Sequence, residues 1–322
     1  MNTPLLVALA LGVLAPGLVC HGVEAVDVAA KPAGPWKSYP TRTLDDLPSI
    51  AAAPADAGLN RFGGRTDRPS RATGFFRTER IDGRWWLIDP EGGRFIHRAV
   101  VSVSMQRAPG AVAALQQKFG GDEPWATQTA AWLHEQGFNG LGAWSDTTRL
   151  RAAPQKLAYT LIWNFMSSYG RKRGGTYQLP GHTGYPKNAI FVFDPEFETF
   201  CDEHARQLEA TKSDPWLLGH FTDNELPLKR DTLANFLSLP ETDPGFRAAQ
   251  AFLRERRGAT ATIKDATEAD QQDFLALVVD RYLGLVTRAI RRVDPNHLVL
   301  GSRFHGMQVR YPETFRAAGR HL

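Results

Sequence analysis

Asn224 and Glu225 are two adjacent residues whose types and position favour acid–base chemistry. They follow the apolar stretch 216–221, which begins after the turn at Asp214-Pro215 and is soon followed by Pro227, so this stretch has the bounds of a buried strand. Barrel enzymes place catalytic carboxyl groups just past the C-terminal ends of such strands. An acid there can protonate a leaving sugar while a neighbouring amide holds a sugar hydroxyl. A surface loop with helix-capping side chains is the alternative.

Strands and helices that alternate along the chain must position these two residues. Five apolar stretches predict strands that end near Met105, Trp144, Phe165, Phe221 and Phe304. Helices are expected over residues 124–136, 246–257 and 268–292, where apolar side chains recur at helical spacing. The Asp82-Gly83 step predicts an N-terminal β-hairpin. We therefore predict an α/β fold of the (β/α)8 TIM-barrel type, incomplete with about five barrel strands, with a doubly wound sheet as the rival.

Residues 1–25 have the features of a secretory signal peptide. An uncharged apolar run over residues 4–19 precedes a small-residue cleavage site at Val23-Glu24-Ala25. Residues 26–71, rich in Pro, Ala, Gly and Arg, are predicted to be a linker or an irregular wrap. Residues 72–322 are predicted to form the N-terminal part of the barrel. The protein is therefore expected to be secreted or periplasmic.

The apolar run is interrupted by Pro16 and is too short to span a bilayer comfortably, so no membrane span is expected. A lipid anchor at Cys20 is a weaker alternative, because Val19 is larger than the residue usual before a lipidated cysteine. Cleavage after Ala25 would leave Cys201 as the only cysteine, which excludes a disulfide framework.

The composition of the 322-residue chain excludes several other classes of protein. The net charge is +4 and the basic residues are scattered apart from Arg171-Lys172-Arg173, whereas nucleic-acid binding requires a concentrated basic stripe. No glycine-rich phosphate loop follows a strand, so a nucleotide is not expected. No His, Cys and Asp residues have metal-ligand spacing, so we predict no metal and no cofactor.

Several motifs occur in one particular order along the chain. They are Gly74-Phe75-Phe76-Arg77, the stretch 82–92, Gly137-Phe138-Asn139, Trp144-Ser145-Asp146, Asp223-Asn224-Glu225, and Asp294-Pro295-Asn296-His297 followed by the stretch 300–304. In this order and spacing the chain resembles the β-agarase-like glycoside hydrolases of the large retaining clan with (β/α)8 barrels. The resemblance runs from about residue 60 to the end of the chain.

The resemblance implies roles for four of these residues. Glu225 corresponds to the general acid/base at the end of the fourth strand, and Asn224 to the neighbour that binds the sugar hydroxyl next to the scissile bond. Trp144 and Asp146, at the exit of the second strand, correspond to substrate-binding residues. Packing in the barrel core is the alternative for Trp144, and a helix cap is the alternative for Asp146.

Three further features border the expected cleft. Arg303 and His305 leave a strand at its C-terminal end and are expected to line the cleft, with pairing to surface acids as the alternative. Asp223 is expected to support the turn rather than to act as a third catalytic acid. The Gly-rich stretch 167–188 is predicted to be a loop whose Tyr and His residues cover a sugar groove, unless it is merely a flexible connection.

Retaining enzymes of this clan use a second Glu, at the end of the seventh strand, as nucleophile. After Glu225 the chain has Glu241, Glu255, Glu268 and Glu313, which the pattern places in a long excursion or at helix starts. The chain is therefore expected to be cut off before the nucleophile strand. Residues 26–322 alone are accordingly expected to be poorly soluble and inactive, because an open barrel leaves sheet edges unpaired.

The expected function is that of an exported, agarase-like glycoside hydrolase. It would cleave a β-linked galactan or related polysaccharide with retention, with a polysaccharide or oligosaccharide as its partner. A truncated, non-catalytic carbohydrate-binding remnant is the alternative from another class, and a secreted structural protein without sugar affinity is a third.

Overall fold

The computed structural model describes residues 24–31, 33–41, 58–105 and 108–322, so the predicted signal peptide up to residue 23, including Cys20, lies outside the described residues. The chain divides into two compact units, Met1–Asp56 and Ala57–Leu322. In the first unit, β1 (Glu24–Ala29) pairs antiparallel with β2 (Trp36–Thr41). Strand β1 begins at the end of the predicted signal peptide, residues 1–25, and the rest of the pair lies in the segment 26–71, for which a linker or wrap is predicted. Within the described ranges, no helix combines the length and apolar character needed to cross a membrane.

Five parallel strands form the central sheet of the second unit. In spatial order they are β6 (Ala99–Val100), β7 (Gly140–Leu141), β8 (Ala158–Ile162), β11 (Leu217–Asn224) and β12 (Leu298–Arg303). Each strand lies beside the next parallel strand along the chain, and the order does not reverse as it does in a doubly wound sheet. The predicted α/β fold with five parallel strands is therefore confirmed, and all five carboxyl ends lie at one edge of the sheet.

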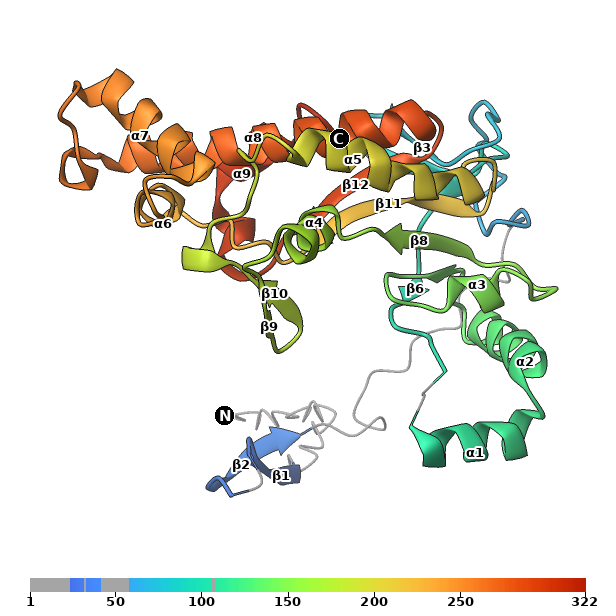
Figure 1. Ribbon diagram of the computed structural model, residues 1–322. Coiled ribbons are helices and arrows are strands. Elements are labelled where there is room, and N and C mark those ends of the chain that lie inside the picture. The colour runs from blue at the N-terminus through green and yellow to red at the C-terminus, as the bar shows by residue number, and fades with distance from the viewer. Residues whose placement is uncertain (1–23, 32, 42–57, 106–107) are drawn as a thin grey trace, which may run out of the picture. The chain divides into compact units, whose positions relative to one another are not determined.

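Helices alternate with these strands along the chain (Figure 1). They are α1 (Pro109–Phe119), α2 (Asp122–Glu135), α3 (Thr147–Leu150), α4 (Phe165–Arg173), α5 (Phe197–Ala205), α6 (Thr232–Leu237), α7 (Pro244–Arg257), α8 (Glu268–Val293) and α9 (Pro312–Ala318). The long helix α8 begins at a capping box, in which Thr267 and Asp270 each accept a hydrogen bond from the other's backbone N–H. Its buried face packs against α5 and α9, which gives the sheet a thick apolar cover.

A second, antiparallel sheet covers the N-terminal ends of the parallel strands. It consists of β3 (Arg77–Ile81), β4 (Arg84–Ile88) and β5 (Arg94–Phe95), and β3 pairs with β4 across Asp82-Gly83. Buried aromatic side chains join this sheet to the parallel strands. They are Phe62, Phe76 and Phe95, which pack with Ala158 of β8 and Leu218 of β11.

Several local predictions need correction. The strand expected to run from Phe95 to Met105 is confined to the two residues of β6. The Gly-rich stretch 167–188 is not a simple loop, because it contains most of α4 and a hairpin of β9 (Tyr177–Leu179) with β10 (His182–Gly184). Helix α1 was not predicted, and it buries none of its residues, so its sequence lacks the apolar stripe by which a packed helix is recognised.

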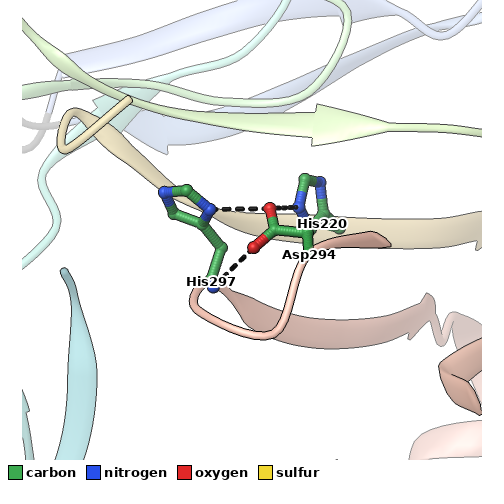
Figure 2. Close-up of side chains that lie close together, drawn as sticks. All are labelled: His220, Asp294 and His297. Carbon is green, nitrogen blue, oxygen red and sulfur yellow. Dashed lines mark hydrogen bonds and ion pairs between the residues drawn. The ribbon is translucent and has the colours of Figure 1, made fainter. Parts of the chain in front are cut away.

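A buried carboxylate ties the start of β12 to β11. Asp294 Oδ2 lies 2.8 Å from His220 Nε2 and 2.7 Å from His297 Nδ1, as Figure 2 shows. Trp163 Nε1 donates to His220 Nδ1 at 2.9 Å, so His220 is neutral and donates its Nε2 proton to Asp294. His297 Nε2 lies 2.9 Å from the backbone carbonyl oxygen of Asp214. Both ring nitrogens of His297 therefore face oxygen atoms that can accept a hydrogen bond.

Hydrogen bonds from the two rings explain how Asp294 stays ionised without contact with water. Burial alone would raise the pKa of Asp294, but the hydrogen bonds from His220 and His297 hold that pKa well below its ordinary value. Burial lowers the pKa of His220, which agrees with a neutral ring. A backbone contact completes the junction, because a Cβ atom on Gly219 of β11 would lie 2.4 Å from the carbonyl oxygen of Leu298. Glycine at this position therefore allows β12 to approach β11 closely.

Replacing Asp294 by Asn should unfold the protein far more readily. The variant would remove the carboxylate that both buried rings contact, and the loss of one partner from a buried ionic network costs about 3–5 kcal/mol. The free energy of unfolding in urea at neutral pH measures the loss. Asp273→Asn is the matched control, because Asp273 pairs with Arg256 and its side chain is 52% exposed. If the two variants lost the same free energy of unfolding, the buried network around Asp294 would not stabilise the protein as described.

Candidate active site

The end of β11 holds the predicted acid in a tightly defined turn. Asn224 is the last residue of the strand, and Glu225 follows it with a φ of +50°. A non-glycine residue in this left-handed region is uncommon and is found preferentially at functional sites. The backbone N–H of Glu225 donates to the carbonyl oxygen of Arg303 at 3.1 Å, so the turn is fixed to β12. The side chain of Glu225 remains 28% exposed and is accessible to a ligand.

Two imidazole rings flank the carboxylate of Glu225. Its Oε2 atom lies 3.8 Å from Nδ1 of His305, which follows β12, and 4.0 Å from Nδ1 of His182, which begins β10. Both distances are longer than a hydrogen bond, so the carboxylate lies near the two rings but forms no hydrogen bond with either of them. The structure therefore brings His305 beside Glu225. It also adds His182, which the sequence placed only in the covering loop.

Arg303 joins the amide of Asn224 to the ring of Trp144. Its Nη1 donates to Asn224 Oδ1 at 2.6 Å, and its guanidinium carbon lies 4.4 Å from the centre of the Trp144 ring, a cation–π contact. Because Oδ1 of Asn224 is engaged in this way, the amide turns its NH2 group outward as a donor for a ligand. Trp144 is 43% exposed, so one face of its ring is available for stacking.

Asp146 has a local structural role. Its side chain caps α3 by accepting from the backbone N–H of Arg149 at 3.3 Å, and it forms an ion pair with Arg149 Nη1 at 2.7 Å. These contacts are the ones expected if Asp146 serves as a helix cap. Asp146 also lines a groove, and a role in substrate binding stays a prediction.

Two hollows meet at Trp144. An open groove of about 860 Å3 is bordered by Met105, Asp146 and Arg149, and a smaller pocket of about 160 Å3 is bordered by Asn164, Arg171, Gln178, His182 and Asn224. Trp144 lines both of them. An extended ligand can therefore pass over this ring, with the Asn224-Glu225 turn beside it, and aromatic faces of this kind stack on sugar rings.

Asp223 supports the site from within the core. It accepts the backbone N–H groups of Met166 and Ser167, at 2.7 and 3.2 Å, and thereby caps the N-terminus of α4. The hydroxyl of Tyr282 in α8 lies 2.7 Å from Asp223 Oδ2. Burial raises the pKa of Asp223 to about 6, although the hydrogen bonds from Tyr282, Met166 and Ser167 act in the opposite direction. These contacts place Asp223 as a support for α4.

His220, Asp294 and His297 are close enough to hold a metal ion, because their ligand atoms lie within 4.8 Å of one another. Their nitrogen atoms are already engaged, however, by Trp163, by Asp294 and by the carbonyl oxygen of Asp214. An ion would have to replace these hydrogen bonds. The group is therefore a hydrogen-bond network. It escaped the sequence analysis because His220 lies 74 residues before Asp294.

Several known proteins resemble this chain in sequence or in fold. No family model matches the chain. The sequence is 24% identical, over a 348-residue alignment, to Beta-agarase B of Vibrio sp. (strain JT0107); the alignment covers 77% of this chain but 35% of that protein. The chain thus spans about a third of the length of this curated relative.

Several solved structures, two of them agarases, share the fold. BpGH50 matches with a TM-score of 0.75 at 23% identity, over 92% of this chain and 68% of that one. The agarase AgWH50C matches with a TM-score of 0.64 at 23% identity, over 82% of this chain and 47% of that one. An exo-beta-agarase matches with a TM-score of 0.65 at 21% identity, over 81% and 50%. The chain therefore resembles the agarase-like glycoside hydrolases, which confirms the resemblance inferred from the ordered motifs.

Asp223→Asn should cost less stability at pH 7 than at pH 4. The pKa of Asp223 is about 6 in the folded protein, against about 3.9 in an unfolded chain. The folded state thus holds the extra proton between these values, and the stability that Asp223 contributes at low pH is lost as the pH rises through 6. Because pH 4 lies close to the unfolded pKa, the expected difference in cost between pH 4 and pH 7 is about 2 kcal/mol.

Unfolding free energies of the parent and the variant at both pH values measure this difference. Asp273→Asn controls for the change in charge, because its partly exposed side chain pairs with Arg256 at the surface. A cost of Asp223→Asn that is the same at pH 4 and pH 7 would show that Asp223 is ionised throughout this range.

Proposed function

We propose that this chain is part of an exported glycoside hydrolase that cleaves a β-linked galactan or a related polysaccharide with retention. The observation that carries the proposal is the Asn224-Glu225 turn at the carboxyl end of the fourth parallel strand, next to the exposed ring of Trp144. The similarity to Beta-agarase B and to the agarase structures supports the substrate class. Export rests on the features of residues 1–25.

Glu225 has the surroundings required of a general acid/base. A departing sugar alkoxide needs a proton, and Glu225 in its acid form donates this proton to the glycosidic oxygen. The resulting carboxylate then takes a proton from the water that releases the second product. The donor NH2 group of Asn224 binds the sugar hydroxyl next to the bond that breaks, and the Trp144 ring stacks under an adjoining sugar.

The second carboxylate of a retaining site lies about 5–5.5 Å from the first. Three of the four Glu residues after Glu225 lie in helices or pair elsewhere: Glu255 is in α7, Glu268 begins α8, and Glu313 is buried in an ion pair with Arg230 at 2.9 Å. We propose that the nucleophile comes from a later strand of a (β/α)8 barrel whose first five strands are β6, β7, β8, β11 and β12, in a part of the protein beyond these 322 residues. The partial coverage of Beta-agarase B supports this division.

A carbohydrate-binding protein without hydrolysis is the second candidate. It requires the same groove and the same stacking ring, but no nucleophile. Binding of galactan oligosaccharides by the whole gene product, without release of reducing ends, would favour this candidate over the hydrolase.

Glu225→Gln in the whole gene product should lower kcat/KM on β-linked galactan by about 10²–10⁴, the contribution of a positioned general acid. An aryl galactoside, whose leaving group departs without a proton, should lose less in the bond-breaking step. Release of reducing ends and of the phenol measures the two rates.

Glu209→Gln is the matched control, because Glu209 pairs with Lys212 at 2.6 Å and its side chain is 56% exposed. It should retain the parent rate on both substrates. Full galactan activity in Glu225→Gln would exclude Glu225 as the acid.

A further inference from the structure

We propose that the smaller pocket, between α4 and the β9–β10 hairpin, binds an anionic substituent on the substrate sugar through Arg171. The substituent would be a sulfate ester or a carboxylate. This inference rests on the proposed function, since it narrows the substrate of the same site to charged galactans. The pocket holds about 160 Å3, which is the space of roughly five water molecules at about 30 Å3 each. It therefore suits one substituted sugar position rather than a chain of sugars.

Arg171 differs from the two cations that follow it at the end of α4. Lys172 lies 3.7 Å from Glu203, and Arg173 pairs with Asp194 at 2.6 Å and with Asp243 at 3.2 Å. Across the described part of the chain, no carboxylate lies within ion-pair distance of Arg171. Its guanidinium donates to Ser168 Oγ at 2.7 Å. Since a guanidinium has five N–H donors, most of them remain for a ligand.

The other walls of the pocket are suited to an anion. Asn164, Gln178 and Asn224 contribute amides, His182 contributes an imidazole, and the residues that line the pocket include no Asp or Glu. A neutral sugar hydroxyl would be satisfied by the amides alone. A guanidinium without a counter-ion, by contrast, matches the two oxygen atoms that a sulfate or a carboxylate presents side by side.

The pocket also lies next to the residues that are proposed to take part in catalysis. It shares Trp144 with the larger groove and Asn224 with the catalytic turn. Its His182 side chain lies 4.0 Å from the carboxyl group of Glu225. An anionic group in this pocket would therefore belong to a sugar at or next to the bond that is cleaved.

Binding of matched oligosaccharides tests this inference. The whole gene product carrying Glu225→Gln, which prevents cleavage, is titrated calorimetrically with three galactan tetrasaccharides. One is neutral, one carries a sulfate ester and one carries a carboxylate. We expect at least one charged ligand to bind roughly tenfold more tightly than the neutral one, as charge-assisted hydrogen bonds predict. The charged tetrasaccharide that binds more tightly identifies the substituent as a sulfate ester or as a carboxylate.

Three added substitutions assign the preference to a residue. Arg171→Ala should abolish it, Arg171→Lys should restore part of it, and Lys172→Ala should leave it intact, because Lys172 belongs to the Glu203 pair. Equal binding of all three ligands, no binding of any, or a preference that survives Arg171→Ala would overturn the inference. Cleavage of neutral galactan by the parent enzyme is measured separately, so the proposed function can stand when the anion pocket fails.

Discussion

The Asp294 carboxylate, shared by the buried rings of His220 and His297, is the contact on which the rest of the structure depends. It joins the middle of β11 to the turn that begins β12, and His297 continues the link to the backbone of Asp214. The charge of Asp294 is buried here, and the hydrogen bonds from the two rings offset the cost of removing it from water. Because this network sets β12 against β11, Asn224 and Arg303 become register partners at the other end of the same strands.

Arg303, the register partner of Asn224, contacts the residues that form the site. Trp144 and Glu225 both have positive φ values, +61° and +50°, which non-glycine residues adopt only at a cost. The carbonyl oxygen of Arg303 accepts the N–H of Glu225, and its guanidinium packs on Trp144. One residue of β12 therefore supports both strained positions, and a third contact orients the amide of Asn224. The site is held by strand pairing rather than by its own loops.

The parts of this arrangement that could be predicted leave local signals in the sequence. Apolar stretches bounded by turn residues predict the five parallel strands and place Asn224 and Glu225 at a strand end. Helix α4 left no such signal, because Asp223 caps it from a strand 56–57 residues away and its own N-cap residue, Asn164, forms no side-chain cap. The same holds for His182, whose approach to Glu225 depends on a hairpin that the Gly-rich stretch concealed.

The central claim is that the Asn224-Glu225 turn is where a glycosidic bond is placed. The most direct measurement is a crystal structure of the whole gene product carrying Glu225→Gln, with a galactan oligosaccharide bound. We expect the glycosidic oxygen within about 3 Å of the side chain at position 225, a sugar hydroxyl on Asn224, and a ring stacked on Trp144. An ordered oligosaccharide that lies elsewhere, with no glycosidic oxygen within reach of that side chain, would contradict the account.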